Sequence, residues 1–64
     1  AVPIYQRYLG SIGVVVHPLR PAGVIELADG ERLDVVSEGT FIPIGQQVKV
    51  IAVEGRRILV RVEG

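Results

Sequence analysis

The sequence predicts a small all-β domain, a five-stranded OB-fold barrel with Greek-key connections. The chain has 64 residues, a length that supports one hydrophobic core. Its apolar residues fall into short β-branched runs separated by turns that contain glycine. No segment keeps the apolar period of an amphipathic helix. These observations favour strands joined by turns over helices.

The first strand is expected over residues 11–17, and a proline-rich loop follows it. Pro18 and Pro21 cannot donate ladder hydrogen bonds, so they end the strand and stiffen the loop. Gly23, at the far end of the loop, is expected to permit a positive φ. We therefore expect a rigid connection between the first two strands.

The second and third strands are expected over residues 24–27 and 31–36 as a hairpin. The turn between them ends in Gly30, which should take a positive φ. Side chains alternate between the two faces of a strand. Leu33 and Val35 should therefore share one face of the third strand.

Residues 37–45 break the strand pattern, but they are too apolar for an ordinary solvent-exposed loop. The segment contains Phe41, Ile42 and Ile44. An OB barrel needs a plug at its open end between the third and fourth strands, and this segment could supply one as a short turn. We assign Phe41 to packing, because isoleucines lie beside it in the sequence.

The last two strands are expected over residues 47–53 and 57–63, on either side of a turn at Glu54-Gly55. Alternate positions along both strands are apolar and should face a common core. This alternation assigns six residues to the core: Val48, Val50, Ala52, Ile58, Val60 and Val62.

The barrel domain is accordingly assigned to residues 11–64. Residues 1–10 fit the strand scheme poorly, because Pro3 interrupts the opening apolar stretch and the residues after it alternate weakly. We expect this segment to be a linker, or an edge segment laid along the barrel.

The charge balance argues against nucleic acid as the main partner. Seven basic and seven acidic residues cancel, whereas binding to phosphates relies on a clustered excess of Lys and Arg. The expected second and third strands also carry no aromatic residue on which bases could stack. We expect no nucleic-acid partner, and a single-stranded nucleic-acid-binding OB domain is the alternative function.

The sequence offers no recognisable set of groups for catalysis. It has no cysteine, and its one histidine, His17, has no second His or Cys to complete a metal site. Nothing marks Ser11 or Ser37 as a nucleophile with a base nearby. The glycines lack the spacing and the following helix of a phosphate-binding loop. We expect no enzymatic activity, no metal and no cofactor.

The loop Leu19-Arg20-Pro21 is the candidate partner contact. It holds an apolar residue and an arginine on a proline-stiffened segment, which can anchor a partner at low entropic cost. In that role Leu19 and Arg20 should be at least partly exposed. The alternative is that Leu19 folds inward as a barrel plug and Arg20 only pairs with a nearby carboxylate.

Several motifs together resemble the C-terminal domain of NfeD proteins, over a stretch from about Gly10 to the end of the chain. They occur in the family's order and near its spacing. The motifs are Leu19-Arg20-Pro21-Ala22-Gly23, Asp29-Gly30, Ser37-Glu38-Gly39 and Gly45-Gln46-Gln47-Val48-Lys49-Val50.

The resemblance implies an OB-fold domain appended after several membrane-spanning helices, which would precede residues 1–10. In long family members a ClpP-like serine protease domain precedes it as well. Family genes commonly lie beside genes for stomatin-like membrane proteins. The implied role is a non-catalytic regulatory domain that contacts a stomatin-like partner in membrane protein quality control. The domain itself is expected to be soluble and membrane-associated through its parent protein.

Overall fold

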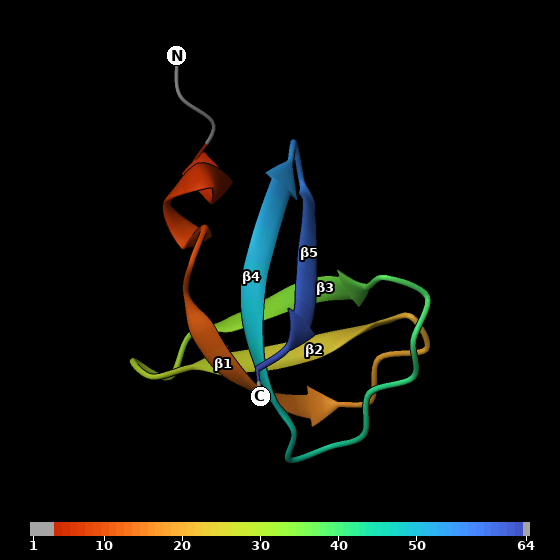
Figure 1. Cartoon of the computed structure of the whole chain (residues 1–64). Coiled ribbons are helices and arrows are strands. Elements are labelled where there is room, and N and C mark those ends of the chain that lie inside the picture. The colour runs from red at the N-terminus through yellow and green to blue at the C-terminus, as the bar shows by residue number, and fades with distance from the viewer. Residues whose placement is uncertain (1–3, 64) are drawn as a thin grey trace.

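Five strands close into a barrel in the computed structural model, which describes residues 4–63 (Figure 1). In chain order they are β1 (Ile12–His17), β2 (Ala22–Leu27), β3 (Arg32–Ser37), β4 (Gln47–Glu54) and β5 (Arg57–Val62). Around the barrel the order is β1-β2-β3-β5-β4. Neighbouring strands are antiparallel, except that β3 and β5 run parallel. The predicted all-β, five-stranded barrel of the OB type is confirmed.

The alternation of side chains along the strands builds the core. On β3, Leu33 and Val35 are buried while Arg32 and Asp34 are exposed, as the sequence predicts. Among the described residues, the buried apolar core consists of Tyr8, Val15, Leu19, Ile25, Leu33, Val35, Ile42, Val48, Val50, Ile58 and Val60.

The last hairpin departs from simple alternation at two of its six predicted core positions. Val48, Val50, Ile58 and Val60 are buried as expected. Ala52 is half-buried, because a bulge between Val50 and Ala52 shifts the register so that Ala52 lies across from Leu59. Val62 is 41% exposed, and its assignment to the core is wrong. The ladder between β3 and β5 ends at Ser37 and Val60, so no β3 residue pairs with β5 as far as Val62.

Residues 4–10, for which the sequence predicts a linker or an edge segment laid along the barrel, include a short helix that packs against the barrel. Ile4–Tyr8 are a short 3-10 helix, η1, packed against β4. Tyr8 is 7% exposed, and its hydroxyl hydrogen-bonds the carboxylate of Glu31 at the start of the β3 hairpin arm. The Gly10 N–H donates to the Val50 carbonyl at 2.9 Å. Residues 1–3 lie outside the described part of the chain.

Gly23 and Gly30 are each required by a different constraint, one by close packing and the other by the backbone conformation. Gly30 has a φ of +89°, which confirms the expected turn conformation. Gly23 does not have the positive φ predicted for it. A Cβ atom at Gly23 would lie 2.4 Å from the carbonyl oxygen of Pro18 and 2.5 Å from Cδ2 of Leu19. Gly23 is therefore required because β2 runs directly against the preceding loop.

Val50→Asp should abolish the cooperative thermal unfolding transition of the domain. The Val50 side chain is 1% exposed, and an unpaired buried carboxylate costs several kcal/mol against a stability of roughly 5 kcal/mol or less for so small a fold. Val62→Asp is the matched control, because it makes the same change on the same hairpin at an exposed position. Equal melting temperatures for the two variants would contradict the described register.

Gly23→Ala should destabilise the domain more than Gly30→Ala, as measured by urea denaturation. At Gly30 the added methyl meets no atom within 4 Å, so the cost is the left-handed backbone conformation, about 1–2 kcal/mol. At Gly23 the methyl would collide with backbone oxygen, and we expect a cost at the upper end of the usual overpacking range of about 1–3 kcal/mol. The reverse order of stabilities would show that the loop can move away from β2.

Candidate functional site

The loops that follow β1 and β3 are joined to each other by a short antiparallel bridge at one end of the barrel. The Leu19 N–H donates to the Ile42 carbonyl at 2.9 Å, and the Ile42 N–H donates to the Leu19 carbonyl at 3.1 Å. Leu19 is 0% exposed and Ile42 is 2% exposed. The expectation that Leu19 is partly exposed is wrong, and the alternative of an inward plug describes it correctly.

The bridge also fixes which side chains face outward. Arg20 and Phe41 lie one step from the bridged pair in the antiparallel register, so they stand opposite each other on the outer side. Cζ of Arg20 lies 5.6 Å from the centre of the Phe41 ring, within the range of a cation–π contact. Phe41 is 55% exposed, so its assignment to interior packing is wrong and Ile42 fills the barrel end instead.

Exposed apolar residues extend this surface along both loops. Pro21, the third residue of the predicted contact, is exposed, and so is Pro43 after the bridge. Ile44 is 62% exposed, the largest exposed fraction among the large apolar residues described. We call Arg20, Pro21, Phe41 and Ile44 the two-loop surface. Sequence reasoning found Arg20 and Pro21 but missed Phe41 and Ile44 as surface residues.

The two-loop surface carries a positive charge that no acidic residue of the described part of the chain pairs with. Three other arginines each form an ion pair with a glutamate: Arg7 with Glu31 at 3.6 Å, Arg32 with Glu26 at 3.4 Å, and Arg61 with Glu38 at 3.0 Å. Arg20 has no ion pair and no side-chain hydrogen bond to any residue from 4 to 63. Its guanidinium donors therefore face solvent beside an aromatic ring.

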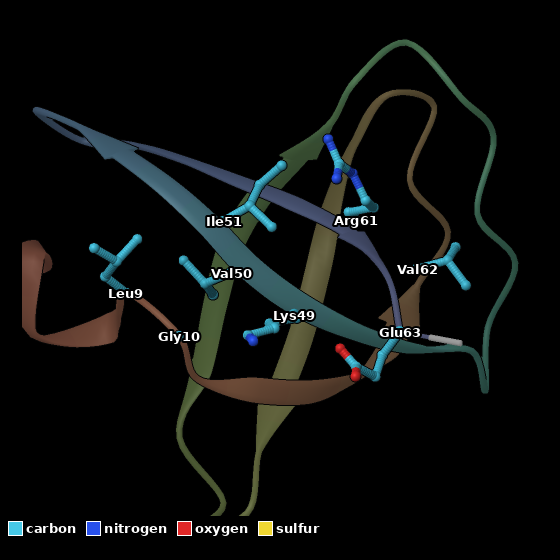
Figure 2. A pocket seen from close by; sticks show the side chains of 8 residues that line it. All are labelled: Leu9, Gly10, Lys49, Val50, Ile51, Arg61, Val62 and Glu63. Atoms are coloured by element: carbon cyan, nitrogen blue, oxygen red, sulfur yellow. The ribbon is translucent and has the colours of Figure 1, made fainter.

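A groove on the outer side of the β4–β5 hairpin is a second candidate site (Figure 2). It has a volume of about 500 Å³ and runs between Leu9 and the end of β5. Lys49 lies across the ladder from Arg61, with Ile51 and Val62 as apolar neighbours. The hydrogen bond from Arg61 to Glu38 raises the pKa of the Arg61 guanidinium, so this charge is already satisfied.

The groove has no net chemical preference that selects a ligand. Its lining combines two cations with the carboxylate of Glu63, and no single apolar side chain dominates it. Its full lining is Leu9, Gly10, Lys49, Val50, Ile51, Arg61, Val62 and Glu63. The two-loop surface, with one unneutralised cation stacked on one aromatic ring, is the better defined of the two sites.

The groups that could support other chemistry are scattered. His17 is exposed at the end of β1, and residues 4–63 contain no cluster of side chains that could hold a metal ion. Ser37 is buried, and its hydroxyl donates to the backbone carbonyl of Thr40, which fixes the turn after β3. Within the same range no helix is long and apolar enough to span a membrane.

Comparison with known proteins identifies a matching family and similar proteins. The family model described as NfeD-like C-terminal, partner-binding domain matches residues 5–61. Membrane protein NfeD1b of Bacillus subtilis (strain 168) is 55% identical over 53 residues, which cover 83% of this chain and 12% of that protein. The chain thus spans about an eighth of the length of this relative.

A solved structure extends the similarity to the whole barrel. The C-terminal domain of stomatin operon partner protein 1510-C from Pyrococcus horikoshii superimposes with a TM-score of 0.82 and 32% sequence identity. The match covers 92% of each chain. Since the family model covers nearly all of its residues and its barrel superimposes on that relative, the chain belongs to the NfeD family as a C-terminal, partner-binding domain.

Proposed function

We propose that this domain binds a stomatin-like membrane protein through the two-loop surface and that the complex serves membrane protein quality control. One observation carries the choice of surface: Arg20 stacks on a half-exposed Phe41 on two loops that are hydrogen-bonded to each other. The partner class is supported by the solved relative, which is named a stomatin operon partner protein.

The two-loop surface has the physical properties of a binding anchor. Arginine and aromatic residues are enriched among the side chains that contribute most to protein interfaces. Here the bridge and Pro21 hold them in place before a partner arrives, which lowers the entropy lost on binding. Exposed phenylalanine and isoleucine also lose contact with water when a partner covers them, which favours association.

The proposed role is non-catalytic and depends on a longer parent protein. The matched relative is named a membrane protein, and this chain corresponds to about an eighth of its length. We infer that other parts of the parent anchor the domain beside the membrane, where a stomatin-like protein also lies. Any protease chemistry of a ClpP-like kind would belong to such other parts.

Capture of a partner tests this proposal directly. We expect the domain to bind the extramembrane region of the stomatin-like protein encoded in the same genome, measured by isothermal titration calorimetry. Phe41→Ala and Arg20→Ala should each weaken binding by about tenfold or more, equivalent to about 1.4 kcal/mol, without lowering the melting temperature. Arg57→Ala is the matched control, because Arg57 is an exposed arginine at the β4–β5 turn that lies outside the two-loop surface.

Two results would count against the proposal. Absence of binding by the unmodified domain would remove the stomatin-like partner. Equal effects of Phe41→Ala and Arg57→Ala would remove the two-loop surface as the contact. The nucleic-acid alternative makes a separate forecast, since binding to a single-stranded oligonucleotide should fall steeply as salt rises.

Leu19→Ala should lower stability while Arg20→Ala leaves it unchanged, in thermal melts of the two variants. Leu19 is fully buried, and truncation of such a leucine costs about 2–5 kcal/mol. Arg20 has no ion pair within the described residues, so its truncation removes only a solvent-exposed contact with Phe41. A Leu19→Ala variant as stable as the parent would mean that Leu19 does not close the barrel.

A further inference from the structure

We infer that the two-loop surface selects a partner segment in which an internal Asp or Glu side chain lies beside an apolar side chain. The carboxylate pairs with Arg20, and the apolar side chain covers Phe41. This inference rests on the proposed function and adds the chemistry of the segment that is bound. It follows from the charge, the geometry and the hydrogen-bonding state of the surface.

The charge of the surface calls for a carboxylate. Arg7, Arg32 and Arg61 each form an ion pair with a glutamate, whereas Arg20 forms no ion pair with any residue from 4 to 63. Arg56 and Arg57 also lack ion pairs in that range, but they lie at the β4–β5 turn, where no large exposed apolar residue accompanies them. Arg20 therefore combines an unmatched charge with an exposed aromatic neighbour.

The stacked arrangement suits a carboxylate bound through two hydrogen bonds. A guanidinium carries five N–H donors in one plane, and a contact with an aromatic face leaves those donors for other partners. Paired N–H donors match the two oxygens of a carboxylate in length and direction. The ring of Phe41 meanwhile holds the cation in position, so little additional ordering is needed when the acid binds.

The backbone at the surface favours an acidic side chain over the carboxylate of a chain end. Recognition of chain ends uses several free backbone N–H groups that converge on the carboxylate. Here the N–H groups of Leu19 and Ile42 are used in the bridge, and the Arg20 N–H donates to Ala22 at 3.3 Å. Pro21 and Pro43 have no N–H at all. The bridge and the two prolines therefore leave no backbone N–H of Leu19, Pro21, Ile42 or Pro43 to join the Arg20 side chain in binding a carboxylate.

The same charge count disfavours a nucleic acid at this surface. A single strand bound along its backbone needs a row of cations as well as an aromatic platform. Arg20 is a lone cation next to Phe41, while three other arginines of the described chain are neutralised by glutamates. One acidic side chain next to one apolar side chain matches what the surface presents.

Titration with short blocked peptides, followed by NMR, tests the inference. The probe is an acetylated and amidated peptide with the sequence Gly-Leu-Glu-Leu-Gly, and its partner has glutamine in place of glutamate. We expect the glutamate peptide to bind with a Kd on the order of 1 mM and to shift signals of Arg20, Phe41 and Ile44. The glutamine peptide should bind at least about tenfold more weakly, since it loses the charge-assisted pair.

Variants locate the effect on the chain. Arg20→Gln should remove the preference for glutamate over glutamine, while Arg57→Gln should keep it. Absence of peptide binding, equal binding of the two peptides, or signal shifts confined to other parts of the barrel would each overturn the inference. So would tighter binding of an unblocked peptide through its terminal carboxylate, or salt-sensitive shifts of Arg20 and Phe41 by an oligothymidine.

The stomatin-like partner is tested by a different measurement, so the two proposals can fail separately. If the partner binds, Phe41→Ala weakens capture and Arg20→Gln does not, the proposed function stands and the acidic segment is excluded. If the unmodified domain captures no stomatin-like protein but still prefers the glutamate peptide, the proposed function fails and the chemistry of the surface stands.

Discussion

The bridge between Leu19 and Ile42 is the interaction on which both the closure of the barrel and its outer surface depend. Two backbone hydrogen bonds join loops that are more than twenty residues apart in sequence. In an antiparallel pair, neighbours along the chain point to opposite sides, so burying Leu19 and Ile42 forces Arg20 and Phe41 outward. Gly23 makes this arrangement possible, because no side chain there keeps β2 away from the loop.

A consequence is that stability and recognition reside in adjacent residues of the same loops. Leu19 and Ile42 stabilise the fold by burying apolar surface inside the barrel. Arg20 and Phe41 lie outside, where a partner can contact them. The two tasks do not compete for the same side chains. The surface can therefore change its chemistry during evolution while the plug beneath it stays the same.

The strands could be predicted from the sequence because their apolar residues recur with the period of the pleat. All five strands lie within about two residues of their expected bounds. Prediction failed where that period is interrupted. The bulge after Val50 is not encoded by any glycine or proline near it, and it altered the environment of Ala52. In the β3–β4 loop, composition indicated apolar packing but could not tell whether Phe41 or Ile42 points inward.

The candidate site was therefore only partly predictable. Arg20 and Pro21 stood out because proline stiffens their loop, while Phe41 was assigned to the interior on hydrophobicity alone. Phe41 points outward because its loop pairs with the β1–β2 loop, and this long-range pairing cannot be read from the local sequence pattern. The burial of Tyr8 was not predicted for a similar reason, since its hydroxyl hydrogen-bonds Glu31, which lies twenty-three residues away in the sequence.

The place of Tyr8 in the core also determines how the barrel responds to tension. A flexible leader would stretch before the fold felt any load, but Tyr8 is packed inside and Gly10 is hydrogen-bonded to β4. A pull on η1 is therefore transmitted to Val50 in the middle of β4. Tension at η1 would thus act directly on the core through Tyr8 and on β4 through Gly10.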